Sequence, residues 1–149
     1  MAPIGTDTIA ASPEAGVGLT ARQVSLGQGT FNVLGGAWPL VSMRSFEAVY
    51  GPKADDWLER TVAGLLMTVG VGQLLSVSDD ELRVSRRIGL GTAATLLLVD
   101  LVYVPKGRIS RMYLQDLVCE AAWIAAWGAV TTRGSHGPAG RRRAGRQRS

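Results

Sequence analysis

Four apolar segments alternate with charged connections through the middle of the chain. The second segment has no charged side chain, the third contains one acid and the fourth contains two. The connections after the second and third segments are short, which suits helices that run antiparallel to their neighbours in a bundle. The pattern therefore predicts an all-α fold, an antiparallel four-helix bundle formed by residues 29–43, 61–78, 88–104 and 112–132.

The character of these segments favours a membrane-embedded bundle. A helix of about 20 residues crosses a bilayer. Residues 61–78 and 88–104 also lack the polar stripe at a helical period that a solvent-facing helix needs. A water-soluble four-helix bundle is the alternative. The first segment contains Pro39. It crosses the membrane if its helix continues through residues 44–50, and it is re-entrant otherwise.

Small residues recur at every fourth position on two of the segments. Such ridges let helix backbones approach closely in lipid, where packing drives helix association. We expect these ridges to face the interior of the bundle, with a contact between two copies of the chain as the alternative. They consist of Gly64, Thr68 and Gly72, and of Ala121, Ala125 and Ala129. Gln73 and Asn32 are expected to form interhelical hydrogen bonds.

The two ends of the chain differ from its middle. Residues 1–28 are rich in small and polar residues, and residues 133–149 contain six arginines and no acid. Both compositions are typical of disordered tails. We expect the basic tail to contact anionic lipid headgroups rather than nucleic acid. Ten basic residues against six then place both termini in the cytoplasm, on either side of a transmembrane domain at 29–132.

The scarcity of cysteine and histidine excludes several kinds of chemistry. Cys119 is the only cysteine, and His136, the only histidine, lies in the basic tail. An intramolecular disulfide, a Cys/His metal site and a Ser-His-Asp triad are therefore not expected. The sequence indicates no catalytic residue, metal or cofactor, and it favours a protein that is not an enzyme.

Three acids inside the apolar segments are the most informative residues, because acids within a membrane are costly and usually face a bundle interior. Asp100 and Asp116 each lie about 6 Å inside the same predicted boundary, and Glu120 lies about one turn deeper. Close carboxyl groups would suit proton transfer or cation binding. The structural alternative is neutralisation by arginines on the same side of the membrane. The candidate polar cluster is Asp100, Asp116, Glu120, Arg44, Arg60 and Glu47, and the candidate pocket lining is Trp123, Trp127 and Tyr113.

The connection at residues 44–60, RSFEAVYGPKADDWLER, combines charge with aromatic side chains. Its first part continues the preceding helix, and Gly51 followed by Pro52 predicts a turn. Asp55 or Asp56 is placed to cap the next helix. The connection is therefore predicted to be a turn first, and the rim of a binding site only if Arg44 or Arg60 reaches the buried acids.

Two motifs carry a resemblance that covers roughly residues 36–127. The first runs from Trp38-Pro39 through Ser45-Phe46-Glu47, Gly51-Pro52-Lys53 and Trp57 to Arg60-Thr61-Val62. The second contains Val99-Asp100, Tyr103, Gly107-Arg108-Ile109, Tyr113-Leu114, Asp116 and Glu120. In both, the chain resembles a family of small bacterial integral membrane proteins and, more loosely, DoxX-like and sterol-isomerase-like membrane folds. The resemblance implies four spans in the bacterial inner membrane and no known reaction.

These patterns predict a small integral membrane protein without catalysis that binds lipid or a membrane partner. Its partners would be membrane lipid, a second copy of the chain or another membrane protein. One alternative is a small proton-coupled transporter that uses Asp100, Asp116 and Glu120. Another is a membrane enzyme for a lipid-like substrate, with Glu120 as the acid or base and Trp123 and Trp127 at its pocket.

Overall fold

The computed structural model of the protein describes residues 19–134, with side chains up to residue 130. Within this range the chain is helical and contains no strand, so the prediction of an all-α fold is confirmed. Residues 1–18 and 135–149, most of the two expected tails, lie outside the described residues. The helices are α1 (Ala21–Val41), α2 (Met43–Tyr50), α3 (Asp56–Leu75), α4 (Asp79–Tyr103) and α5 (Tyr113–Gly134).

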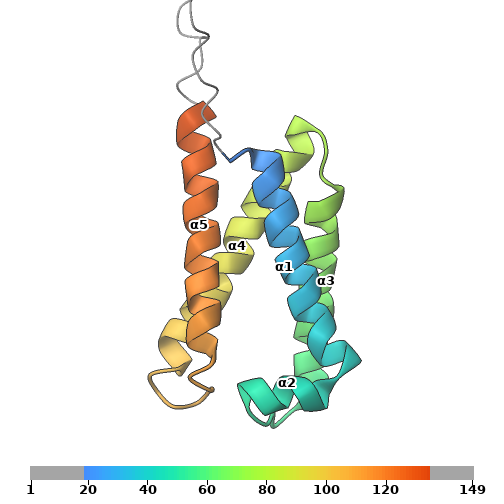
Figure 1. The fold of residues 1–149 in the computed structure, drawn as a ribbon, viewed down its shortest axis with the longest axis vertical. Coiled ribbons are helices and arrows are strands. Elements are labelled where there is room, and N and C mark those ends of the chain that lie inside the picture. Colours follow the sequence, from blue (N-terminus) through green and yellow to red (C-terminus); the bar gives the residue numbers. More distant parts are fainter. Residues whose placement is uncertain (1–18, 135–149) are drawn as a thin grey trace, which may run out of the picture.

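The four long helices alternate in direction, as the short connections predict (Figure 1). The upper end of the bundle carries the start of α1, the connection 76–78 and the end of α5, and the lower end carries α2 and the connection 104–112. The closest packing joins α1 to α3 and α4 to α5. The helix α4 begins beside α3 and ends beside α5, so it crosses the bundle (Figure 1). The helices α1 and α5 diverge toward the lower end.

The helical region begins eight residues earlier than the sequence analysis placed it. Thr20 caps α1: its side chain accepts a hydrogen bond from the backbone N–H of Gln23, and the Gln23 side chain accepts one from the backbone N–H of Thr20. This reciprocal pair is a capping box, which satisfies otherwise unpaired donors at a helix start. The assignment of residues 21–28 to a disordered tail is therefore corrected, because these residues are helical and bring Val24, Ser25 and Gln28 into the core.

The first apolar segment does not continue straight into α2. Pro39 lies within α1, which continues past it and ends at Val41. Ser42 then separates α1 from α2. The Ser42 hydroxyl accepts a hydrogen bond from the backbone N–H of Ser45 and so starts α2 as a new helix. At the other end of α2, Gly51 has a φ of 85°, a conformation that glycine adopts without steric cost. The predicted turn at Gly51 is confirmed.

Small residues do control helix packing, but not those that the spacing indicated. A Cβ atom at Gly29 would lie 2.9 Å from the carbonyl oxygen of Gly70, and one at Gly36 would lie 2.5 Å from that of Ala63. These close approaches explain why α1 and α3 pack tightly. A Cβ at Gly64 or Gly72 would meet no atom within 4 Å, and Ala121, Ala125 and Ala129 are exposed. The expectation that those two ridges face the interior is therefore wrong.

Polar side chains occupy much of the interior, while large apolar side chains cover the outside. Gln28, Gln73 and Glu120 are among the largest fully buried side chains. Every long helix exposes large apolar residues, for example Leu34 at 65%, Leu65 at 63%, Leu98 at 60% and Val118 at 64%. This distribution differs from that typical of a protein folded in water, where buried polar side chains and large exposed apolar surfaces are uncommon.

Among the helices within residues 19–134, none combines the length with the apolar character that crossing a membrane requires. The predicted embedding of the bundle in a membrane is therefore unsupported.

Candidate functional site

The three acids that the sequence analysis selected come from α4 and α5 near the lower end of the bundle. Asp100 lies in the last turn of α4, and Asp116 and Glu120 lie one turn apart at the start of α5. Asp100 is 3% exposed and Glu120 is fully buried. Asp116 and Glu120 are four residues apart, so their side chains lie on the same face of α5. The connection 104–112 thus brings these acids close together.

Several carboxyl oxygens in this group of acids lack a hydrogen-bond partner among the described residues. Neither carboxyl oxygen of Glu120 has a hydrogen-bond partner among the described residues, and Oδ2 of Asp100 has none. A buried polar atom without a partner is costly, and an unpaired buried charge more so. Such an arrangement persists only if a proton, a water or a bound molecule supplies the missing donors.

The arginines proposed to neutralise these acids do not pair with them. Two ion pairs occur within the described residues, between Lys53 and Glu59 at 3.8 Å and between Arg83 and Asp80. The side chains of Arg44 and Arg60 are exposed and contribute to neither pair. The structure therefore does not join the two arginines of the connection 44–60 to the buried carboxyl groups.

The rim of the lower end is organised by Lys53, a residue of the first motif that the sequence analysis did not select for the site. Its Nζ lies 2.5 Å from Oη of Tyr113 and sits over the rings of Phe46 and Tyr113, 5.1 and 4.7 Å from their centroids. Its backbone N–H donates to the Glu47 carboxylate at 2.7 Å. Glu47 and Tyr113, both selected from the sequence, thus belong to this rim. The available sequence signal for the role of Lys53 was its position directly after Gly-Pro.

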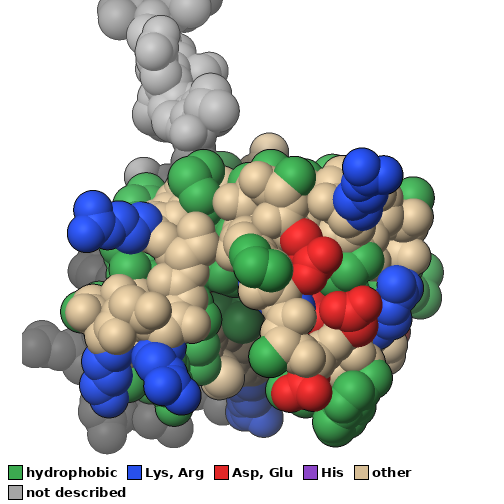
Figure 2. All heavy atoms as spheres, turned by 90° about the horizontal axis from the view of Figure 1, so that it is seen from below, with side chains coloured by type: hydrophobic (Ala, Val, Ile, Leu, Met, Phe, Trp, Pro, Cys, Tyr) green, Lys and Arg blue, Asp and Glu red, His purple; other side chains and the backbone are tan. Residues whose placement is uncertain are grey.

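Aromatic rings connect α1 and α2 to α5 at the same rim. The ring centroids of Trp38 and Phe46 lie 5.7 Å apart, those of Phe46 and Tyr50 4.7 Å, and those of Tyr50 and Tyr113 4.7 Å. The Gln115 side chain donates a hydrogen bond to Oη of Tyr50 at 3.3 Å. These contacts link α1 and α2 to α5 at the lower end, where α1 and α5 lie further apart. Figure 2 shows this face, where charged side chains surround a hollow with hydrophobic side chains at its depth.

A second polar group, the amide network, lies in the middle of the bundle. The indole N–H of Trp127 donates to Oε1 of Gln28 at 2.8 Å, and Nε2 of Gln73 donates to the same oxygen at 2.8 Å. Nε2 of Gln28 donates to the carbonyl oxygen of Gly89 at 3.0 Å. Nδ2 of Asn32 donates to Oε1 of Gln73 at 2.8 Å. The expected interhelical hydrogen bonds of Asn32 and Gln73 are confirmed, and the network joins all four long helices.

The pocket-lining tryptophans have separate roles in the structure. Trp127 is fully buried within the amide network. The Trp123 ring lies against α1, where a Cβ at Gly27 would come within 3.0 Å of it, and its centroid is 6.0 Å from that of Phe31. Above the network, the Ser25 hydroxyl donates to the carbonyl oxygen of Gln73 at 2.8 Å and lies 2.6 Å from the Ser85 hydroxyl. Buried polar side chains therefore occur along the interior from the upper end to the acids.

The described residues contain no group of three His, Cys, Asp or Glu side chains that could hold a metal ion. The acids of α4 and α5 are therefore not arranged as a metal centre.

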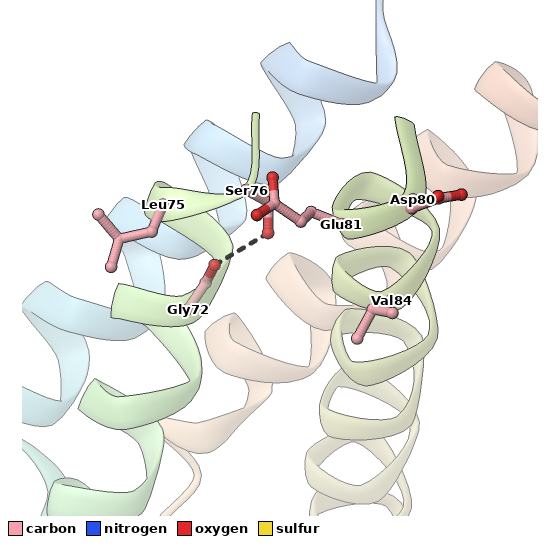
Figure 3. A pocket seen from close by; sticks show the side chains of 6 residues that line it. All are labelled: Gly72, Leu75, Ser76, Asp80, Glu81 and Val84. Carbon is pink, nitrogen blue, oxygen red and sulfur yellow. Dashed lines mark hydrogen bonds between the residues drawn. The ribbon is translucent and has the colours of Figure 1, made fainter. Parts of the chain in front are cut away.

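A groove at the upper end of the bundle is separate from Asp100, Asp116 and Glu120. It has a volume of about 340 Å³ and lies between the end of α3 and the start of α4. Figure 3 shows its lining, in which the Ser76 hydroxyl donates to the carbonyl oxygen of Gly72 at 2.9 Å. Glu81 accepts hydrogen bonds from the backbone N–H groups of Ser78 and Val77. These bonds lower the pKa of Glu81. Of the two acids in this groove, Glu81 caps α4 and Asp80 pairs with Arg83.

The fold and its interior define a small all-α protein with a polar core, an apolar exterior and buried carboxyl groups between α4 and α5. No known protein family, characterised protein or solved structure matches the chain. Membership of the family of small bacterial membrane proteins that the two motifs indicate thus stays a prediction.

Proposed function

We propose that this protein is a multi-pass integral membrane protein that binds a ligand inside its helical bundle without catalysing a reaction. The observation that carries the proposal is the distribution of apolar and polar side chains. Leu34, Leu65, Leu98 and Val118 point outward from four different helices, while glutamine, asparagine and carboxyl side chains point inward.

Burial of apolar surface is worth about 25 cal/mol per Å², so an exterior of this kind is unfavourable in water and favourable against lipid chains. Inside a membrane, polar side chains face the bundle interior and hydrogen-bond across helices. The overall hydropathy of each helix includes these inward residues, such as Gln28, Gln73 and Glu120, although lipid would not contact them. The surface that lipid would contact is more apolar than the whole helix.

The proposed orientation places the upper end in the cytoplasm. The first turns of α4 carry Arg83, Arg86 and Arg87 at this end, and the arginine-rich segment 133–149 begins at the end of α5. Basic residues near spans favour the cytoplasmic side. In the proposed arrangement, the acids and the aromatic rim face the opposite side of the bacterial inner membrane.

A second candidate function, proton-coupled transport, is favoured by Glu120. Its carboxyl group is fully buried and both of its oxygens lack a hydrogen-bond partner within the described residues. Intramembrane acids of this kind occur in proton relays of pumps and transporters. Reconstituted vesicles separate the two functions: a carrier moves protons together with its substrate, whereas a binding module leaves the proton gradient unchanged.

Membrane insertion is tested with the full chain expressed in bacteria. The protein should stay in the membrane pellet after alkaline carbonate extraction and require detergent for release. A protein released by carbonate alone would contradict the proposal.

Orientation is tested in a Cys119→Ala background, which removes the only cysteine. Ser78→Cys at the upper end and Lys106→Cys at the lower end then form a matched pair. In intact cells, a membrane-impermeant maleimide should label the cysteine at position 106 and label the one at 78 only after the cells are opened. Equal labelling of both positions in intact cells would exclude the proposed topology.

A further inference from the structure

A groove runs along the outside of the bundle between α3 and α4, and we call it the α3–α4 groove. These two helices follow each other in the chain, yet the closest packing joins α3 to α1 and α4 to α5. Two hollows lie between them: the upper groove described above, of about 340 Å³, and a second hollow of about 330 Å³. Apolar side chains dominate the lining of the second hollow, which includes Val62, Leu65, Val69, Ile88, Gly91 and Leu96.

The two hollows follow one another along the same helix faces. Val84 lines the upper hollow, and Ile88 and Gly91 line the lower one. Residues three or four positions apart share a face of a helix, so these residues form one row along α4. On α3 the lining runs from Ser76 to Val62, a length of about 20 Å along the helix axis. The α3–α4 groove is therefore continuous from the upper end toward the middle of the bundle.

The lower hollow has the properties of a site for a hydrocarbon chain. Leu65 at its edge is 63% exposed. The Thr95 hydroxyl in its lining donates to the carbonyl oxygen of Gly91 at 2.8 Å, so this polar group is satisfied within its own helix. A Cβ at Gly91 would meet no atom within 4 Å, so the space beside α4 is unfilled there. In the proposed membrane, lipid acyl chains surround this position.

Charged groups are arranged in order along the upper part of the groove. Glu81 lines the upper hollow, and Figure 3 shows its carboxylate reaching from α4 toward the end of α3. The hydrogen bonds that Glu81 accepts from described residues all go to Oε2, so Oε1 can accept from another donor. Arg87 lies six residues further along α4, about 9 Å nearer the lower hollow. It is exposed, and neither ion pair within residues 19–130 includes it.

This order is complementary to a phospholipid with an ethanolamine headgroup. In such a lipid the protonated amine is outermost, the phosphate comes next and the acyl chains are deepest. A direct ion pair needs atoms within about 4 Å, whereas the spacing of Glu81 and Arg87 leaves room for an ammonium and a phosphate between their side chains. A headgroup with a negative charge alone would face the like charge of Glu81. A choline headgroup has no N–H to donate to Oε1.

We infer that the α3–α4 groove binds a phospholipid with a primary ammonium headgroup. The ammonium donates to Oε1 of Glu81, the phosphate accepts hydrogen bonds from the Arg87 guanidinium group, and one acyl chain fills the lower hollow beside Gly91. Basic groups between helices at the cytoplasmic face commonly bind lipid headgroups. The site lies on the outside of the bundle, apart from the buried acids. This inference rests on the proposed membrane insertion and adds a lipid site to the proposed ligand-binding function.

The test uses the purified full-length chain in detergent, mixed with equal amounts of dioleoyl phosphatidylethanolamine, phosphatidylcholine and phosphatidylglycerol. These lipids share their acyl chains and differ in mass, so native mass spectrometry separates their complexes. We expect one phosphatidylethanolamine to be retained, with a preference of about threefold to fivefold over each of the other two. Equal retention of phosphatidylcholine, or a preference for phosphatidylglycerol, would overturn the inference.

A groove variant locates the acyl chain. Gly91→Leu places a side chain in the unfilled space of the lower hollow and should weaken retention of phosphatidylethanolamine at least about tenfold, since the chain loses its buried position. Gly128→Leu is the matched control, because Gly128 is exposed on α5 and a Cβ there also meets no atom within 4 Å. Equal retention by the two variants would place the lipid elsewhere and contradict the inference.

Headgroup variants separate the two polar contacts. Glu81→Gln retains the capping box but removes the charge, so the preference for phosphatidylethanolamine over phosphatidylcholine should disappear. Arg87→Gln should weaken the binding of both lipids and leave their ratio unchanged. Asp56→Asn, at an exposed acid in the first turn of α3 at the lower end, is the control and should change neither. A preference that persists in Glu81→Gln would exclude the proposed ammonium contact.

The remaining outcomes distinguish this inference from the proposal on which it rests. A dimer without bound lipid that Gly91→Leu dissociates would show a second copy in the groove and would overturn the inference. Loss of lipid selectivity in a protein that resists carbonate extraction rejects the phospholipid site alone. Release by carbonate rejects membrane insertion, and lipid retention is still measured on the purified protein.

Discussion

The indole nitrogen of Trp127 and the side-chain oxygen of Gln28 lie 2.8 Å apart, although the two residues are 99 positions apart in the chain. This hydrogen bond joins the first and last long helices, which diverge toward the lower end (Figure 1). It also fixes the orientation of the Gln28, Gln73 and Asn32 amides. The indole N–H of Trp127 thus determines which amide atom lacks a hydrogen-bond partner among the described residues, namely Oδ1 of Asn32.

Replacing Trp127 with phenylalanine removes this donor and part of a fully buried ring. We expect Trp127→Phe to lower the free energy of unfolding by about 2 kcal/mol, from the lost hydrogen bond and the smaller side chain. Thermal unfolding of the purified protein, followed by circular dichroism, measures the change. Trp57→Phe, at a position that is 68% exposed, is the control and should have little effect. Equal melting temperatures for the two variants would show that the network does not stabilise the bundle.

Gly89 is predicted to be intolerant of any side chain. A Cβ there would collide with Oε1 of Gln28 and approach Nε2 of Gln73 to 2.6 Å, so Gly89→Ala should destabilise the bundle by about 2 kcal/mol or more. Gly91→Ala is the matched control, because a Cβ at Gly91 meets no atom within 4 Å. The control should be stabilising by about 0.5–1 kcal/mol, from the higher helix propensity of alanine. Equal thermal stabilities of the two variants would contradict the described packing of α4.

Lys53 is predicted to hold the lower rim together. Lys53→Met keeps an apolar stem but removes the ammonium group, which contacts Tyr113 and lies over the Phe46 ring. The expected loss is about 1 kcal/mol, together with faster amide hydrogen exchange at the start of α5. Lys106→Met tests the specificity of the effect, because Lys106 is exposed and lies over the Tyr103 ring at 5.6 Å. Similar exchange rates in both variants would argue against a role for Lys53 at the rim.

The start of α4 should loosen in acid. Hydrogen bonds from Ser78 and Val77 lower the pKa of Glu81 below that in the unfolded chain. Its contribution to stability is therefore present above the unfolded pKa and is lost as the pH falls through the lower, folded pKa. Hydrogen exchange in the first turn of α4, relative to the intrinsic rate at each pH, should increase as the pH falls through this lowered pKa. Glu81→Gln should remove this pH dependence, and a variant that retains it would assign the effect to another group.

Local signals predicted the order of the long helices but not all of their ends, since residues 79–87, which precede the third predicted segment, form the start of α4. Apolar segments separated by short charged connections predicted the antiparallel helices, and Gly51 predicted the turn after α2. The start of α1 was missed because residues 21–28 resemble a tail in composition. The Thr20 and Gln23 pair was the available signal, since a threonine followed three residues later by glutamine is typical of a capping box.

The acids could be selected from the sequence because charge within an apolar segment needs a local reason, and one turn separates Asp116 from Glu120. Their lack of an arginine partner could not be foreseen, since it depends on where Arg44 and Arg60 point. Gln28 could not be selected either, because its importance comes from Trp127 and Gly89, which belong to distant parts of the chain.

The sequence by itself determined the order of the long helices and which acids would be costly to bury, because both depend on neighbouring residues. Only the tertiary structure decided which face of each helix is inside. When a helix is apolar on most sides, its sequence gives little information about which face turns toward the interior. Close approach of Gly29 to Gly70 and the hydrogen bonds of Gln28 and Gln73 set that rotation here. For that reason Gly64 and Gly72 lie outside, and unpartnered oxygens lie within.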